Sequence, residues 1–111
     1  MKIDELQDKQ SDVNIELKVI YDKMVEKETP WGQVAKTVVV VDIDSEQGGT
    51  TALLDLFDDD IKKYAFQDKL KVVNGFAKKI TTKRGEQMLI TYGFKDKKLV
   101  GHYEKIEEVE K

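Results

Sequence analysis

The valine-rich stretch from Val34 to Ile43 (VAKTVVVVDI) constrains the fold of this chain more than any other feature. β-Branched residues favour strands, because their side chains pack well on a pleated surface. The stretch is followed by Ser45 to Gly49 (SEQGG), where paired glycines permit the positive φ angles of a turn. Thr50 to Phe57 (TTALLDLF) then supplies a second run of strand-forming residues. Together these segments predict a β-hairpin.

Three further segments carry strand patterns. Val13 to Val19 alternates apolar and polar residues, which is the pattern of a strand buried on one face. Leu70 to Ile80 contains Gly75 in its interior, which predicts a bulge or a bend. Gln87 to Tyr92 is the fifth strand, and the polar segment Thr81 to Glu86 before it predicts a turn between the last two strands.

A short helix is predicted between the third and fourth strands. Asp58 to Asp60 interrupts the strand pattern, and acidic residues suit the first turn of a helix, where they cap free N–H groups. Ile61 to Phe66 can then form one or two helical turns. Three strands, a short helix and two strands is the order of the OB-fold, a partly open Greek-key barrel.

We therefore predict an all-β fold, a five-stranded OB-fold barrel with a short helix between strands 3 and 4. A five-stranded sandwich is the alternative, and the helix favours the barrel because it covers the open end. The 111 residues suit one domain, residues 1–111, with a short charged C-terminal end from about residue 104. Leu99 to Ile106 is predicted to be a short strand or a covering segment.

Composition limits the class of protein. A net charge of −3 and a pI of about 5.2 argue against a surface that holds phosphates everywhere, although they allow one basic groove. The chain has no cysteine, which excludes disulfides and thiolate metal sites. The polar N-terminus is unlike a signal peptide, and no apolar run approaches the roughly 18 residues of a membrane span. We therefore expect a cytoplasmic protein that does not bind membranes.

Several short motifs follow one another along the chain. They are Ile3-Asp-Glu-Leu6, Val41-Asp42 entering a turn, Leu54-Asp-Leu-Phe57, Ile61 with its polar helix, and Leu70-Lys-Val-Val-Asn-Gly-Phe76. In this order they resemble the archaeal single-stranded-DNA-binding proteins of the OB-fold type, relatives of the domains of replication protein A. The resemblance covers residues 3 to 92 and consists of a hydrophobic pattern with a few aromatic positions. It implies a module that binds single-stranded DNA, or RNA.

The resemblance assigns binding roles to two aromatic positions. Phe57 closes the third strand and Phe76 follows an Asn–Gly pair in the fourth, as the family's stacking residues do. Ile80 occupies a third contact position, where the family has an aromatic residue. Each phenylalanine is equally consistent with a place in the core, because Phe57 ends its strand and a bulge at Gly75 decides which face Phe76 takes. Asp55, on the same side of its strand as Phe57, would repel phosphate.

Trp31 lies in a turn-forming segment, Lys27 to Gln33 (KETPWGQ), beside the only proline of the chain. The loop between the first two strands borders the ligand groove in OB-folds. Aromatic rings hold single strands by stacking on their bases. We therefore expect Trp31 to stack on a base, with Pro30 stiffening the loop. The alternative is a ring that folds back as a lid over the barrel.

Basic residues around the loop between the fourth and fifth strands predict a wall that follows a phosphate backbone. They are Lys78, Lys79, Lys83 and Arg84, which is the only arginine, and Lys36 is expected across the groove. The alternative is a solvated hairpin turn in which lysines fall by chance, since the chain contains many of them.

No pattern indicates catalysis, a metal or a cofactor. His102 is the only histidine and has no partner nearby in the sequence. The segment Asp42 to Gly48 lacks the glycine position of a calcium loop, and Leu53 stands where its bidentate glutamate would be. We expect a non-enzymatic module that binds single-stranded DNA or RNA with little sequence preference. The alternative is a protein-interaction OB domain without nucleic-acid binding, which the net acidity and Asp55 favour.

Overall fold

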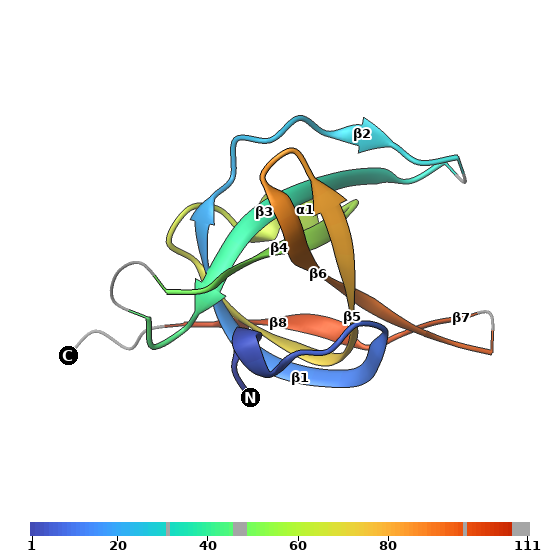
Figure 1. The fold of residues 1–111 in the computed structure, drawn as a ribbon. Helices are drawn as coiled ribbons and strands as arrows, with labels where there is room; N and C mark the ends of the chain where they lie inside the picture. The colour runs from blue at the N-terminus through green and yellow to red at the C-terminus, as the bar shows by residue number, and fades with distance from the viewer. Residues whose placement is uncertain (31, 46–48, 97, 108–111) are drawn as a thin grey trace.

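The computed structural model describes residues 1–30, 32–45, 49–96 and 98–107. Figure 1 shows an all-β fold with one short α-helix in this part of the chain. A single 3-10 turn, Ile3–Glu5, precedes the first strand. The remaining elements are β1 (Gln10–Tyr21), β2 (Lys27–Glu28), β3 (Val34–Asp42), β4 (Thr51–Phe57), α1 (Asp60–Lys63), β5 (Lys69–Thr82), β6 (Gly85–Lys95), β7 (Lys98–Val100) and β8 (His102–Ile106).

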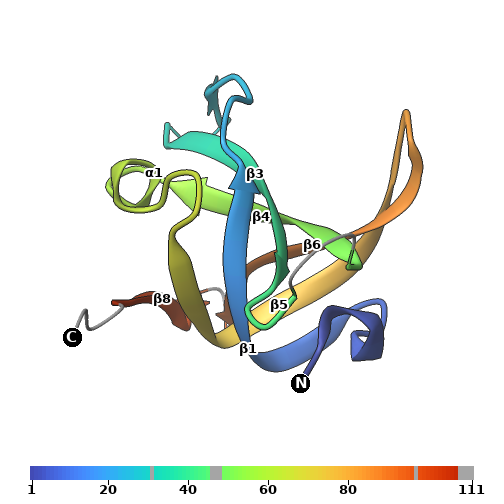
Figure 2. The same cartoon turned by 90° about the vertical axis from the view of Figure 1, so that its left-hand side faces the viewer.

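Five strands close into a barrel in the order β1, β3, β4, β6, β5 and back to β1. Neighbours in this ring are antiparallel except β4 and β6, which run parallel through the pairs Leu53–Leu89 and Leu54–Ile90. Figure 2 shows the ring, with the hairpin of β5 and β6 extending from one side. This five-stranded barrel is the OB-fold, so the predicted fold class is confirmed. The sandwich alternative is wrong, because one sheet closes on itself.

Alternation along the strands fills the barrel with aliphatic side chains. On β4, Leu54 and Leu56 are fully buried, whereas Asp55 and Phe57 take the opposite face and remain partly exposed. The side of β4 that carries Leu54 and Leu56 therefore faces the core. The core residues with no exposed surface are Val13, Leu17, Val19, Val38, Val40, Leu54, Leu56, Leu70, Val72, Ala77 and Ile90.

The helix α1 lies after β4 as predicted, but the acidic residues before it do not cap it. Its N-cap residue, Asp59, makes no side-chain capping hydrogen bond. Asp58 instead accepts a hydrogen bond from the Val34 backbone N–H at 3.2 Å, which ties the end of β4 to the start of β3. The helix ends at Lys63, because Tyr64 already has extended backbone geometry and is buried against the core.

A bulge occurs in β5 beside Gly75, as predicted. The pairing of β1 with β5 shifts between Val13–Gly75 and Ile15–Val72, so β5 carries one extra residue there. Gly75 is buried, and a Cβ at this position would lie 2.5 Å from the Val72 Cγ1 atom. The extra residue resets the alternation of β5. Beyond the bulge Gly75 and Ala77 face the core, and Phe76 between them faces outward.

In the described residues, three further strands lie outside the ring. β2 pairs with β3, β7 with β6, and β8 with β5. The predicted strand or covering segment from Leu99 to Ile106 is therefore two short strands. Residues 104–106, which the sequence placed in the charged C-terminal end, belong to β8. In the described ranges, no helix combines the length and apolar character that crossing a membrane requires.

Candidate functional site

The outward-facing residues of β3, β4, β6 and β5 form a continuous surface, which we call the outer face. Strand pairing places Val39 beside Leu53, Leu53 beside Leu89, and Leu89 beside Lys78. Directly paired residues share one face of a sheet, so these four side chains form a row across all four strands. The row is apolar at the β3 end and cationic at the β5 end.

A groove lies along one margin of the outer face. It has a volume of about 680 Å³ and separates the segment that follows β1 from the tip of the β5–β6 hairpin. We call it the hairpin groove. The residues that line it are Ile20, Tyr21, Met24, Val39, Thr51, Leu53, Thr82, Lys83, Arg84 and Gln87. It thus combines an apolar floor with two cations on one wall.

The hairpin tip holds its two cations in a fixed turn. Lys83 and Arg84 are the two loop residues, and Gly85 after them has a φ of 101°, which suits glycine. The Arg84 backbone N–H donates to the Thr82 hydroxyl at 3.1 Å, and that hydroxyl donates to the Gly85 carbonyl at 2.9 Å. Neither cation forms an ion pair with any residue in the described ranges. Both charges are therefore available to a ligand.

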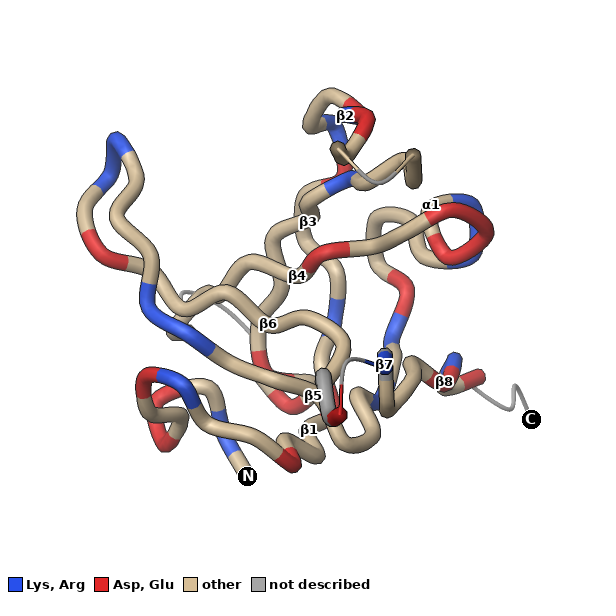
Figure 3. Tube along the Cα trace, turned by 90° about the vertical axis from the view of Figure 1, so that its right-hand side faces the viewer, with Lys and Arg blue, Asp and Glu red and all other residues tan. Residues whose placement is uncertain are grey.

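Five of the predicted site residues come together on this side of the molecule. Phe76, Lys78 and Ile80 alternate along the outer face of β5, which then leads to Lys83 and Arg84 at the tip. Ile80 pairs with Gln87, a residue that lines the groove. Figure 3 shows basic residues at the hairpin tip and again further along β5. The predicted β5 contacts and the hairpin groove therefore form one surface.

The other predicted residues lie elsewhere. Lys79 is on the opposite side of β5 from Lys78, and its backbone N–H donates to Asp8 Oδ1 at 2.8 Å. Lys36 pairs with the buried Leu56, so it shares the core side of β3 and does not face the groove. Lys36 was therefore wrongly placed across the groove. Trp31 lies outside the described residues, and its stacking role stays a prediction.

Phe57 belongs to an aromatic cluster at the α1 end of the barrel. Its ring lies 5.4 Å from that of Tyr92, centroid to centroid. Tyr92 stacks on Tyr103 at 4.4 Å, and Tyr103 meets the edge of Tyr64 at 6.3 Å. In Figure 2, α1 and the hairpin tip lie on opposite sides of the barrel. Phe57 is therefore separated from the hairpin groove and contributes part of its surface to this cluster.

Two hydroxyl hydrogen bonds anchor the aromatic cluster. The Tyr103 hydroxyl donates to the Asp55 backbone carbonyl at 2.7 Å, and the Tyr92 hydroxyl donates to Asp60. Burial raises the pKa of both tyrosines, and it raises the pKa of Tyr64 to about 12. These rings consequently stay neutral and pack as apolar groups at physiological pH.

Asp55 places a half-buried carboxylate on the outer face. Its Oδ1 atom accepts a hydrogen bond from the Thr37 hydroxyl at 2.8 Å, across the β3–β4 ladder. Burial raises the pKa of Asp55, while the Thr37 hydrogen bond and the charge of Lys78 oppose that shift. Lys78 therefore offsets part of the negative charge of Asp55, which was expected to repel the phosphates of a nucleic acid.

Sequence reasoning missed the second wall of the groove. Ile20, Tyr21 and Met24 form it, and 47% of Tyr21 is exposed. Their position in the sequence could have indicated this wall. The loop between the first two strands borders the groove in OB-folds, so the residues that connect the first strand to this loop are expected to border it as well. Tyr21 is therefore an additional aromatic candidate for contact with a ligand.

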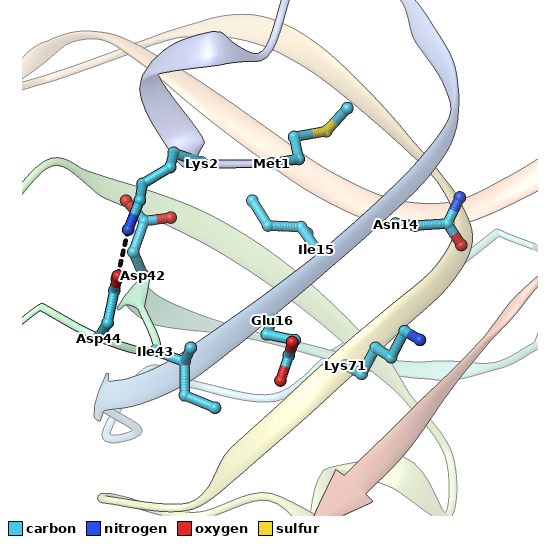
Figure 4. A pocket seen from close by; sticks show the side chains of 9 residues that line it. All are labelled: Met1, Lys2, Asn14, Ile15, Glu16, Asp42, Ile43, Asp44 and Lys71. Atoms are coloured by element: carbon cyan, nitrogen blue, oxygen red, sulfur yellow. Dashed lines mark hydrogen bonds and ion pairs between the residues drawn. The ribbon is translucent and has the colours of Figure 1, made fainter.

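A second depression lies beside the N-terminus and has a volume of about 400 Å³. Figure 4 shows Lys2 forming an ion pair with Asp44 at its edge. The Ile3 backbone N–H donates to Asp42 Oδ1 at 2.9 Å. Asp42 and Asp44 thus hold the N-terminal segment against the end of β3. This depression serves the fold.

No family model matches the chain, and no curated protein matches it.

Proposed function

We propose that the protein binds single-stranded nucleic acid, DNA in the first instance, along the outer face and the hairpin groove, without catalysing a reaction. The observation that carries the proposal is the groove itself, where Lys83 and Arg84 lie beside an apolar floor. Proteins that bind single strands combine cations for the phosphates with apolar and aromatic surfaces for the bases. Neither contact requires a particular base, so most of the binding would tolerate any sequence.

The arrangement of cations favours a path along β5. A single-stranded nucleic acid that enters between Tyr21 and Arg84 can continue past Ile80 towards Phe76. Lys78 lies midway along this path. Three cations then meet phosphates. Each neutralised phosphate of a single strand contributes about −0.7 to the slope of log K against log salt concentration, so we expect a slope of roughly −2. The net charge of −3 should affect binding less than these three cations do. Exposed charges more than about 10 Å from the nucleic acid are largely screened at 0.1 M salt.

Fluorescence anisotropy with a labelled, unstructured oligonucleotide tests the proposal directly. Lys83→Ala and Arg84→Ala should each weaken binding and make the salt slope less steep by about 0.7, because each removes one phosphate contact. Lys62→Ala is the matched control, since it removes one positive charge from α1, outside the groove. Equal losses in all three variants would show a general charge effect. Absence of binding by the unmodified protein would refute the proposal.

A protein ligand is the second candidate, and the aliphatic character of the groove favours it. The floor consists of Val39 and Leu53, with Met24 on the wall, whereas single-strand binders usually present aromatic rings there. Val25 in the same segment is 79% exposed. If no oligonucleotide binds, the apolar groove would be assigned to a peptide segment of a partner, with Tyr21 as an anchor.

A further inference from the structure

Asp55 is the only acidic residue among the described outward-facing positions of β3, β4, β5 and β6. It lies two residues beyond Leu53 on the same face of β4, so it follows directly from the groove floor. Two residues of a strand span about 7 Å, roughly the reach of one nucleotide. The charge of Lys78 acts on Asp55, so a nucleic acid that follows β5 past Lys78 also runs beside this carboxylate.

One oxygen of the Asp55 carboxylate is held by a hydrogen bond, and the other has no hydrogen-bond partner in the described residues. Thr37, its direct partner across the ladder, donates to Oδ1 and fixes the rotation of the group. In the described residues the Asp55 Oδ2 atom has no hydrogen-bond partner. Every buried polar side-chain atom of those residues has a partner, so the unpaired Oδ2 atom must be exposed to solvent. The free oxygen is thus held at the surface as a hydrogen-bond acceptor. An asparagine could satisfy Thr37 equally well, so the Thr37 bond alone does not require a carboxylate.

A carboxylate can only accept hydrogen bonds at neutral pH, and this distinguishes the bases. Cytosine carries an amino donor at N4, whereas thymine carries the acceptor O4 at the equivalent place. Adenine and guanine also present amino groups. An acceptor on the protein therefore attracts amino-bearing bases and repels the thymine O4 atom.

We propose that Asp55 determines base preference: its Oδ2 atom accepts a hydrogen bond from the exocyclic amino group of a base, so that a cytosine is bound in preference to a thymine at this position. The inference depends on the proposed nucleic-acid function and adds one selective contact to an otherwise tolerant surface. Lys78 would stabilise the charged carboxylate in the complex, since its charge already favours that form in the free protein.

Competition between dC12 and dT12 at neutral pH tests the inference. These oligomers present the same base edge in every binding register. At position 4 cytosine has an amino donor where thymine has a carbonyl acceptor, and at N3 cytosine has an acceptor where thymine has an N–H donor. The unmodified protein should bind dC12 about five- to tenfold more tightly, the lower range for one base contact. Asp55→Asn should abolish or reverse that ratio, because the amide oxygen can keep the Thr37 bond while the amide nitrogen offers a donor to thymine O4.

Two further variants separate a base contact from simple charge repulsion. Asp59→Asn makes the same change of charge on the exposed N-cap residue of α1 and should leave the ratio unchanged. Thr37→Val should lower the ratio without changing the net charge, because it removes the bond that orients the carboxylate.

Three results would overturn the inference. Equal binding of dC12 and dT12 by the unmodified protein would do so even if Asp55→Asn failed to fold, and it would leave the proposed function intact. A parallel gain in both affinities in Asp55→Asn, with the ratio preserved, would assign Asp55 a repulsive role only. Absence of binding to either oligomer would overturn the proposed function and this inference with it.

Discussion

Replacement of Tyr103 tests whether β8 and the aromatic cluster stabilise the barrel. Tyr103 lies in β8, outside the five-stranded ring, yet it is only 7% exposed. Its ring stacks on Tyr92 and contacts the edge of Tyr64, and its hydroxyl bonds to the Asp55 backbone carbonyl. The side chain therefore makes three separable contributions.

The expected magnitudes follow from these contacts. Tyr103→Phe keeps the ring and removes one hydrogen bond, so it should cost about 1 kcal/mol, and somewhat more if the Asp55 carbonyl is left unpaired. Tyr103→Ala removes the ring as well and should cost about 3–5 kcal/mol, as other truncations of large buried aromatic residues do. The larger loss is a substantial part of the roughly 5–15 kcal/mol that stabilises a typical domain.

Urea denaturation followed by far-ultraviolet circular dichroism measures both losses. Tyr21→Ala is the matched control, since Tyr21 is 47% exposed and should cost less than about 1 kcal/mol. A loss for Tyr103→Ala no greater than that of the control would refute the reasoning. It would mean that β8 is only loosely associated with the barrel and that the cluster contributes little to folding.

Three other perturbations have defined outcomes. Stability should fall as the pH rises above about 10, because unfolded tyrosines ionise there while burial raises the pKa of Tyr64 to about 12 and raises those of Tyr92 and Tyr103. The measurement uses Tyr21→Phe, which removes the exposed tyrosine, and tyrosinate absorbance that appears in this variant before the loss of circular dichroism would contradict the prediction. Phe57→Ala should cost about 1–3 kcal/mol of stability in urea denaturation and leave oligonucleotide affinity in anisotropy nearly unchanged. Unchanged stability with weakened oligonucleotide binding would instead support a stacking role for Phe57. Gly101→Ala should cost at least about 2 kcal/mol of stability in urea denaturation. Gly101 has a φ of 81°, and an added Cβ would lie 2.4 Å from two backbone oxygens of β5. An unchanged denaturation midpoint would show that β8 can shift away from β5.

Local sequence patterns were sufficient to predict the barrel. The valine-rich run, the period-two alternation from Val13 and the break at Asp58 each reflect interactions between residues close together in the chain. Strand propensity and turn chemistry operate over a few residues, so their order along the chain carried the fold class. The cap predicted from Asp58 to Asp60 was wrong, because the N-cap residue Asp59 makes no capping bond and the Asp58 carboxylate accepts from Val34, which is 24 residues away.

The candidate site required the tertiary structure, because it depends on which face each side chain takes. One extra residue in β5 reverses the alternation, so the position of the bulge decides that Lys78 faces outward and Lys79 does not. Lys36 likewise falls on the core side of β3 because it pairs with Leu56. The sequence by itself determined the order of the five barrel strands and the place of the helix. Packing decided which of their side chains share a surface, since that depends on strand register and on neighbours such as Tyr103 that are distant in the chain.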